Sequence, residues 1–151
     1  MQNHYGGNKK ERSALKTYVT LMRAAESVTH RIHQHLSSTG LTLSQFAALE
    51  ALYHLGPLSQ KEIGKKILRS SGNITMVIDN LEKRGLVQRK RHTVDRRYFI
   101  VHLTSQGKKL IGDIFPRHAA VIATEMAVLS AGERETLSKL CKKLGLKINI
   151  S

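Results

Sequence analysis

The stretch from residue 59 to residue 104 constrains the fold most strongly, because helix signals and strand signals follow one another in it without a gap. Ser59 and Glu62 form an S-x-x-E capping box that starts a short helix, and a second helix then ends at Gly85. Residues 86–103 alternate in the manner of two short strands. Helix, turn, helix and hairpin in this order predict a winged helix-turn-helix module within a mainly α (α+β) fold.

The second helix of this module combines an apolar stripe with an outer face of small polar residues and Asp79. Small polar residues let a helix approach DNA closely and hydrogen-bond to phosphates or base edges. The stripe expected to be buried consists of Ile74, Val77, Ile78 and Leu81. The predicted DNA contacts are Ser70, Ser71, Gly72, Asn73, Thr75 and Met76, together with Ser59 and Gln60 from the preceding helix. An ordinary solvated face is the alternative for any one of these side chains.

The hairpin is strongly basic, and its tip is expected at residues 92–96. Lysines and arginines dominate residues 83–97, where Asp95 is the single acid. Arginines on a hairpin tip suit insertion into a narrow minor groove, where the negative potential is focused. The predicted DNA contacts here are Arg84, Lys90, Arg91, Arg96 and Arg97. Because a carboxylate would repel phosphate, we expect Asp95 to orient an arginine. Strand alternation predicts that Phe99, Val101 and Leu103 point inward.

The charge balance favours a polyanionic partner, and its clustering in the hairpin favours double-stranded DNA over an unspecialised basic surface. The 151-residue chain has 25 Lys and Arg against 11 Asp and Glu, a formal net charge of +14. Each cation brought to a phosphate releases condensed counterions. No apolar run in the sequence approaches the length of a membrane span, so a cytoplasmic location is the default expectation.

Long helices are predicted on both sides of the module. Residues 1–11 are expected to be flexible, and a heptad-like seam predicts one helix from Ser13 to about Ser38. A second S-x-x-E box at Ser130 starts the last helix, whose apolar positions are Leu137, Leu140, Cys141 and Leu144. These stripes exceed what a small core can cover, which favours packing against a partner chain, with a monomeric core as the alternative.

These elements define three expected regions. Residues 12–38 and 105–148 form a helical dimerisation region, and residues 39–104 form the DNA-binding domain. Within that domain a T-x-x-Q box at Thr42 starts a helix that turns Phe46, Leu49, Leu52 and Tyr53 toward the core. We expect Pro116 to kink the helix that begins near Ser105, with a true break as the alternative.

Three motifs carry a family resemblance: residues 81–87 (LEKRGLV), residues 95–97 (DRR) and residues 103–107 (LTSQG). They are similar to the L-x-x-x-G-L-[IV], D-x-R and L-T-x-x-G signature of the MarR family of transcriptional regulators, and the similarity covers about residues 13–144. The resemblance implies a homodimer on a pseudo-palindromic operator, with residues 70–76 in the major groove. It also implies that Arg97 is the minor-groove arginine and that Asp95 orients it.

The resemblance further implies a repressor that a small aromatic or phenolic effector releases from DNA. Residues 113–116 (DIFP) make the chain similar to the branch that responds to quinones and phenols. The candidate effector contacts are Tyr18, Met22, His33, Phe46, Tyr53 and Phe115, and an ordinary core position is the alternative for each. Quinone sensors often use a cysteine near the first helix. The lone Cys141 is instead in the last helix, where we expect a packed, inert thiol.

Other chemistries have less support in the sequence. His30, His33 and His118 could converge on a metal, but no H-E-x-x-H or C-x-x-C pattern accompanies them, so we expect no metal or other cofactor. The sequence has no Gly-rich phosphate loop and no nucleophile elbow, so we do not expect an enzyme. Two other functions stay open: a metal- or thiol-operated sensor, and a non-specific architectural DNA-binding protein.

Overall fold

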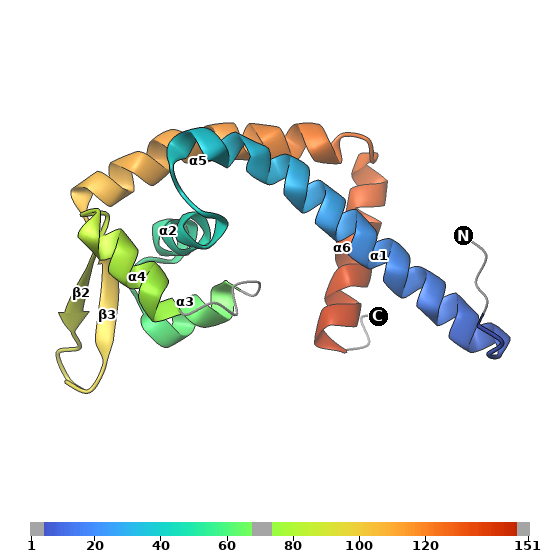
Figure 1. The fold of residues 1–151 in the computed structure, drawn as a ribbon, viewed down its shortest axis with the longest axis horizontal. Coiled ribbons are helices and arrows are strands. Elements are labelled where there is room, and N and C mark those ends of the chain that lie inside the picture. The colour runs from blue at the N-terminus through green and yellow to red at the C-terminus, as the bar shows by residue number, and fades with distance from the viewer. Residues whose placement is uncertain (1–4, 68–73, 148–151) are drawn as a thin grey trace. The chain divides into compact units, whose positions relative to one another are not determined.

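The computed structural model describes residues 5–67 and 74–147, and its helices and strands are drawn in Figure 1. The chain divides into two compact units. One unit comprises residues 35–123, and the other joins residues 1–34 to residues 124–151.

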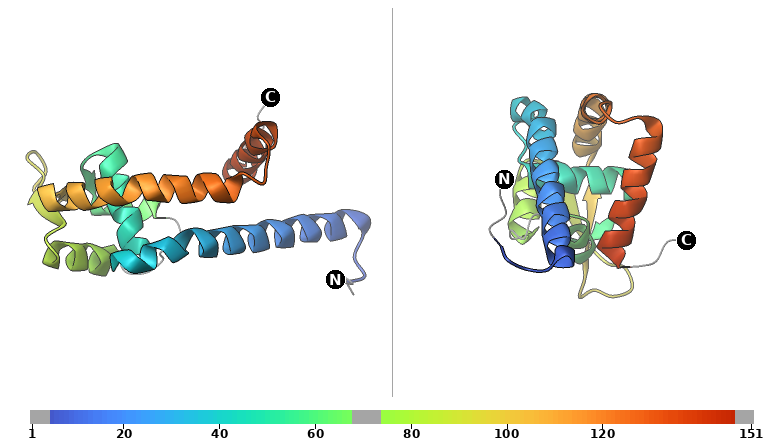
Figure 2. Two further views of the ribbon diagram at one scale, coloured as in Figure 1. Left: turned by 90° about the horizontal axis from the view of Figure 1, so that it is seen from above. Right: turned by 90° about the vertical axis from the view of Figure 1, so that its right-hand side faces the viewer.

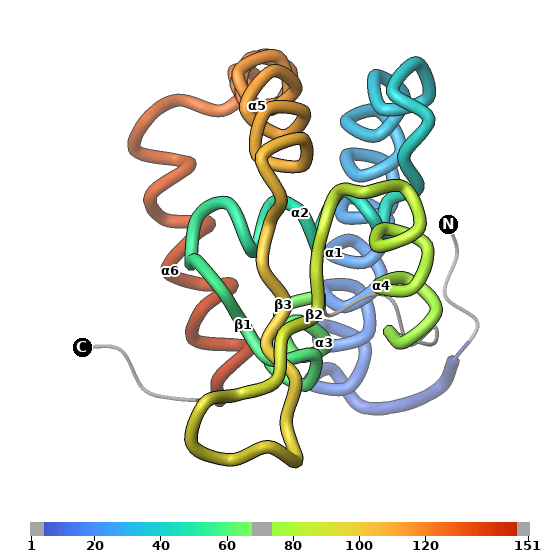
Figure 3. Tube along the Cα trace, turned by 90° about the vertical axis from the view of Figure 1, so that its left-hand side faces the viewer, coloured from blue at the N-terminus to red at the C-terminus, as the bar shows by residue number. Residues whose placement is uncertain are grey.

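Short helices and a small sheet form most of the unit of residues 35–123. The helices are α2 (Leu43–Leu55), α3 (Gln60–Lys66) and α4 (Ile74–Lys83), and the strands are β1 (Leu58–Ser59), β2 (Val87–Arg91) and β3 (Phe99–Leu103). The strands are antiparallel in the order β1-β3-β2. In Figure 3 the hairpin of β2 and β3 projects from this unit, with α4 beside its base. The predicted winged helix-turn-helix and its mainly α (α+β) class are confirmed.

The sheet contains a strand that was not predicted. β1 pairs with the middle of β3, where Leu58 lies opposite Val101 and Ser59 lies opposite Ile100. A strand of two residues is too short to show an alternating pattern, so only its tertiary pairing reveals it. β1 joins the start of α3 to the hairpin.

The core of this unit is apolar and combines residues from the helices and the hairpin. Its buried members are Leu36, Leu41, Phe46, Ala48, Leu49, Leu52, Ile63, Ile67, Ile78, Leu81, Leu86, Val87, Val101 and Ile111. The prediction that Tyr53 and Phe99 point into the core is wrong, since Tyr53 is 39% and Phe99 is 41% exposed. α2 is apolar around most of its circumference, so its sequence period does not select one face. Phe99 lies opposite Arg91 near the tip of the hairpin, beyond the buried core positions of β2 and β3.

Local capping signals set the helix boundaries. The predicted boxes are confirmed: Thr42 Oγ1 accepts from the backbone N–H of Gln45, and Ser59 Oγ accepts from that of Glu62, both at 3.2 Å. α4 ends at Lys83, and the chain turns away at Gly85, whose φ of +73° is in the left-handed region that favours glycine.

Helix α5 (Ser105–Met126) begins on the module and is continuous through Pro116. The alternative of a break at this proline is therefore wrong. Thr104 caps the helix, because its Oγ1 accepts from the N–H of Gly107 at 3.0 Å and donates to the carbonyl of Gly85 at 2.6 Å. Gly107 packs against the Leu86 backbone so closely that an added Cβ would overlap the Leu86 carbonyl. The L-T-x-x-G motif thus fixes the joint between α4, the hairpin and α5.

The other unit is dominated by α1 (Lys9–His33) and α6 (Ala131–Leu146), which Figure 2 shows from two further sides. α1 begins before the predicted Ser13, because Asn8 and Glu11 form a capping box. Residues 9–11 are therefore helical rather than a flexible start. The chain after His33 continues as a 3-10 helix over Gln34–Thr39, whereas the prediction extended the α-helix to Ser38.

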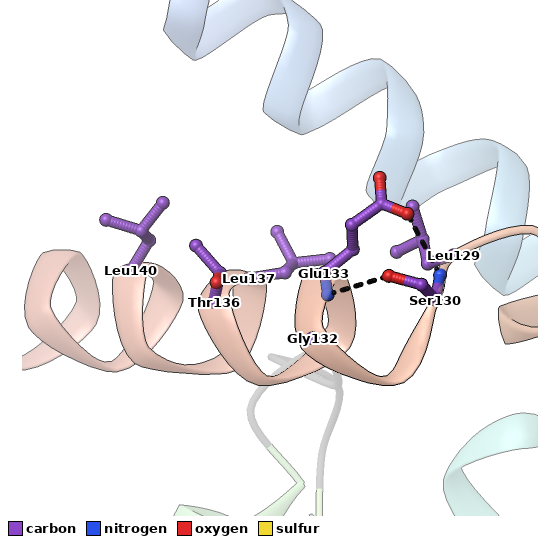
Figure 4. Close-up of a pocket in the computed structure, with 7 residues that line it drawn as sticks. All are labelled: Leu129, Ser130, Gly132, Glu133, Thr136, Leu137 and Leu140. Carbon is purple, nitrogen blue, oxygen red and sulfur yellow. Dashed lines mark hydrogen bonds between the residues drawn. The ribbon is translucent and has the colours of Figure 1, made fainter.

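Neither α1 nor α6 buries any of its described side chains within the single chain. The exposed large apolar residues of the two helices include Leu15, Tyr18, Met22, Leu137, Leu140, Leu144 and Leu146. α6 starts with the predicted capping box of Ser130 and Glu133, whose two hydrogen bonds are drawn in Figure 4. The helices are therefore well defined locally, while their apolar residues remain in contact with solvent.

Candidate nucleic-acid interface

One part of the interface lies where α3 approaches the start of α4. Gln60 Nε2 donates a hydrogen bond of 2.7 Å to Thr75 Oγ1, so two of the predicted contacts lie together. Met76, the next residue, has an exposed side chain. The predicted contacts Ser70, Ser71, Gly72 and Asn73 lie outside the described residues.

Ser59 has a structural task in addition to any contact with DNA. Its hydroxyl caps α3, and its backbone N–H donates to Glu62 Oε2 at 2.7 Å. These two bonds, the backbone one first, hold the pKa of the Glu62 carboxyl below its ordinary value. Glu62 therefore stays ionised at the N-terminus of α3, where a negative charge is favourable.

The tip of the hairpin holds one arginine in a defined orientation. Asp95 accepts hydrogen bonds from the backbone N–H of Arg97 at 3.1 Å, from its Nε at 3.0 Å and from its Nη2 at 2.8 Å. The Arg97 side chain is nevertheless 84% exposed. The hydrogen bonds from Arg97 lower the pKa of Asp95, and the carboxylate raises the pKa of Arg97 in turn. The two groups form the pair predicted from the D-x-R motif.

His92 shapes the same tip from the other side. Its Nδ1 accepts from the backbone N–H of Asp95 at 3.0 Å and from that of Val94 at 3.3 Å. The N–H of His92 donates to the carbonyl of Tyr98 at 2.9 Å, which closes the hairpin loop. The tip is thus an internally hydrogen-bonded loop.

The other predicted basic contacts differ in their surroundings. Arg91 lies over the ring of Phe99, with its guanidinium carbon 4.9 Å from the ring centroid, and donates to the carbonyl of Arg96 at 2.7 Å. Lys90 and Arg96 are exposed on the hairpin. Arg84 donates to the carbonyl of Gly40 at 3.1 Å, so it ties the end of α4 to the chain before α2.

The hairpin also carries Arg89, a residue outside the predicted set of contacts. Its Nη2 lies 2.7 Å from Asp79 Oδ1, its Nη1 lies 3.3 Å from Glu82 Oε1, and its side chain is only 18% exposed. Asp79 was predicted on the outer face of α4, but it faces Arg89. The spacing of Asp79 and Glu82, three residues apart on one helix face, is the signal that could have identified an arginine partner.

The candidate effector residues fall in both units. In residues 35–123, Tyr53 and Phe115 lie with ring centroids 6.3 Å apart, and His54 packs edge-on against Phe115 at 4.5 Å. Phe46 is a core residue whose ring lies 4.5 Å from that of His118. In the other unit Tyr18 and Met22 are exposed on α1, and His33 is half-buried.

A pair of histidines lies beside this aromatic group. His35 Nε2 and His118 Nδ1 are 2.8 Å apart, and His118 is buried. Burial lowers the pKa of His35, and the nearby charge of Arg117 lowers it further. Within the described residues, no group of three or more His, Cys, Asp or Glu side chains could hold a metal ion.

An open groove of ≈ 580 Å³ runs between α1 and α6. Its lining from α6 comprises Leu137, Leu140, Cys141 and Leu144, and its lining from α1 includes Leu21 and Ala24. The Cys141 thiol is exposed, so the prediction of a packed cysteine is wrong for the single chain. A second open pocket, of ≈ 570 Å³, is shown in Figure 4, where Leu137 and Leu140 line it with the start of α6. This unit therefore presents apolar concave surfaces.

Comparison with known proteins identifies the family. Residues 41–99 match the model described as MarR family. Over 88% of its length the chain is 41% identical to the HTH-type transcriptional regulator MhqR of Bacillus subtilis, and the match covers 92% of MhqR. The chain belongs to the MarR family.

Two solved structures with a similar fold extend the comparison. The fold of Bordetella bronchiseptica BpsR, whose DNA binding is regulated by 6-hydroxynicotinic acid, gives a TM-score of 0.76 at 25% identity, covering 86% of this chain and 98% of BpsR. The S. aureus MepR–DNA complex gives 0.72 at 25% identity, covering 87% of this chain and 97% of MepR. This member of the MarR family is a DNA-binding transcriptional regulator. In the described part of the chain, no helix combines the length and apolar content needed to cross a bilayer.

Proposed function

We propose that this MarR family regulator is a cytoplasmic homodimeric repressor that binds a pseudo-palindromic operator and leaves it when a small aromatic or phenolic molecule binds. The observation that carries the DNA-binding part is the Asp95–Arg97 pair, in which an exposed guanidinium is held by three hydrogen bonds. Holding a long side chain in place before binding lowers the entropy that its ordering costs on DNA. In the proposal Arg97 enters the minor groove and Asp95 orients it.

The proposed dimer uses residues 12–38 and 105–148. Its support is the apolar surface of α1 and α6, on which Leu15, Met22, Leu137, Leu140 and Leu144 remain exposed. Burial of apolar side chains against a second copy is worth about 25 cal/mol for each Å² removed from water. An isologous contact between copies would cover this surface and present two DNA-binding modules, residues 39–104, to one duplex.

The proposed DNA contacts are divided by position. At the helix-turn-helix they are Ser59, Gln60, Thr75 and Met76, with Ser70, Ser71, Gly72 and Asn73 added on the sequence motif alone. On and beside the wing, which is the hairpin of β2 and β3 with its loop, they are Arg84, Lys90, Arg91, Arg96 and Arg97. Phosphate contacts from the arginines and lysines supply affinity, and base contacts from the helices supply selectivity.

The effector part of the proposal is supported by similarity and by one cluster. The DNA binding of BpsR is regulated by an aromatic acid, 6-hydroxynicotinic acid. In this chain Tyr53, His54 and Phe115 form a partly exposed aromatic group that a planar ligand could stack on. Tyr18, Met22 and His33 are the further proposed contacts, whereas Phe46 supports the cluster from within the core. A ligand that favours one arrangement of the dimer shifts it off DNA by its difference in affinity.

Arg97→Ala tests the role of the wing. With a fragment selected from genomic DNA by the unmodified protein, binding should weaken, and the slope of log K against log salt should flatten by about 0.9 because one cationic contact with the groove is lost. Lys139→Ala removes an equal charge from an exposed position of α6 and should leave the slope unchanged. Unchanged affinity and slope for Arg97→Ala would remove the wing from the proposal.

A further inference from the structure

We infer that Arg89 is a positioning residue for sequence readout, which fixes the amide of Gln60 against Thr75 and does not itself bind phosphate. The inference rests on the proposed function, in which α3 and the start of α4 contact DNA. It concerns the selectivity of the protein, that is, the ratio of its affinity for its own site to its affinity for other DNA.

The charge of Arg89 is already neutralised inside the protein. Its guanidinium lies between two carboxylates, with Nη2 at 2.7 Å from Asp79 and Nη1 at 3.3 Å from Glu82. The backbone N–H of Arg89 also donates to Glu82 Oε2 at 2.8 Å. With 18% of its side chain exposed, the arginine has little surface to offer a phosphate. Arg97 on the same hairpin has the opposite character, being largely exposed.

The remaining hydrogen bonds of the guanidinium are to Gln60 and Thr75, two of the proposed DNA contacts. Nη2 donates to Gln60 Oε1 at 3.3 Å and to the backbone carbonyl of Thr75 at 3.4 Å. Gln60 Nε2 in turn donates to Thr75 Oγ1 at 2.7 Å. A guanidinium has donors and no acceptor, so it can only face the oxygen of the Gln60 amide. Arg89 thereby decides which end of that amide faces Thr75.

The orientation of an amide determines what it can read. Glutamine distinguishes bases by presenting one donor and one acceptor in a fixed arrangement, and a good pairing discriminates against a wrong base by roughly five- to a hundredfold. Without the guanidinium, the Gln60 amide can rotate and exchange the positions of Oε1 and Nε2. The loss should then fall on selectivity, while the attraction to any duplex is unchanged.

Arg89 also links three elements that must keep their relative positions. It belongs to β2, Gln60 opens α3, and the Thr75 carbonyl, Asp79 and Glu82 belong to α4. α4 packs against both α3 and β2, and Figure 3 shows it beside β2. Because the guanidinium is a rigid planar fork, a lysine at this position keeps the charge but cannot bridge all these partners.

The decisive experiment measures Arg89→Lys with the full-length protein, on a fragment selected from genomic DNA and on random-sequence DNA of equal length. The affinity ratio between the two DNAs should fall about tenfold, with the salt slope for random DNA unchanged. Lys10→Arg exchanges the same two residue types at an exposed position outside the proposed DNA-binding and dimer regions. This control should keep both the affinity ratio and the salt slope. If Arg89→Lys instead weakens binding to both DNAs by the same factor, so that their affinity ratio is kept, Arg89 is a phosphate contact and the inference is overturned.

Gln60→Ala keeps the test decisive if Arg89→Lys does not fold. It should lower the same affinity ratio by a similar factor. Where Arg89→Lys does fold, the double variant should lose little more selectivity than either single variant, since both changes remove one interaction. A Gln60→Ala protein with an undiminished ratio would overturn the inference. If the unmodified protein shows no preference for the selected fragment, the proposed function fails instead, which separates the two outcomes.

Discussion

Gly107 illustrates how a single residue fixes the joint between the module and α5. A Cβ at this position would overlap the carbonyl group of Leu86, which is backbone and cannot swing aside. We predict that Gly107→Ala lowers the free energy of unfolding by about 1–3 kcal/mol, as overpacking in a close contact does. Gly132→Ala in the exposed first turn of α6, where nothing lies within 4 Å, should change it little. Equal denaturation midpoints for the two variants would refute this account of the joint.

His35 makes stability depend on pH. Burial lowers its pKa from the ordinary 6.5, so the folded state prefers the neutral ring and the unfolded state binds the proton more readily. Its contribution is therefore fully present above pH 6.5 and declines as the pH falls below that value. His35→Gln keeps a hydrogen-bonding group beside His118 but cannot titrate. Urea unfolding between pH 7 and pH 5 should show a smaller fall in stability for this variant, and parallel curves would contradict the assignment.

The sequence predicted best those residues whose hydrogen-bond partners are close to them in the sequence. The capping boxes at Thr42, Ser59 and Ser130 depend on partners three residues away, and all three are confirmed. The contact of Asp95 with Arg97 is equally local. Arg89 was missed because its partners come from α3 and α4, and only the fold brings them to one strand.

At the scale of the element, the helices were predicted, and their burial was predicted only in part: Phe46, Leu49 and Leu52 of α2 are buried as expected, and Tyr53 is not. Periodicity located α1, α2 and α6, but the exposed Tyr53 shows that a helix apolar on most sides gives no direction. The two-residue β1 has no period at all. Phe99 follows the alternation of β3 and is still exposed, because the apolar cover ends before the hairpin does. The alternation of apolar residues along a strand shows which residues lie on the same face of the sheet. It does not show how far along the strand the core extends.

The exposed stripe of α6 gives a prediction for assembly. Leu140→Glu places a carboxylate on an apolar surface that is exposed in the single chain, so the fold should tolerate it. In the proposed dimer that carboxylate would be buried without a partner. The dissociation constant of the dimer should therefore rise at least about a hundredfold. Sedimentation equilibrium measures this directly, with Lys139→Ala on the same helix as control. A Leu140→Glu protein that associates as the unmodified one does would show that α6 lies outside the interface.

At the scale of the whole molecule, charge and geometry have separate tasks. A net charge of +14 attracts any duplex, and that attraction weakens as salt is added. Specific binding needs in addition two modules held at a fixed spacing, which in the proposal is the work of residues 12–38 and 105–148. The sequence resemblance supplied this arrangement, whereas the net charge alone was equally compatible with an unspecialised basic surface.

A hydroxyl-radical footprint of the unmodified protein on a fragment selected from genomic DNA tests the account most directly. Two symmetry-related modules predict two protected patches on one face of the duplex, with centres about 34 Å, or roughly ten base pairs, apart. Excess random-sequence DNA should leave both patches in place. A single protected patch, or protection that random DNA removes as readily as the selected fragment does, would contradict a dimeric, sequence-specific regulator.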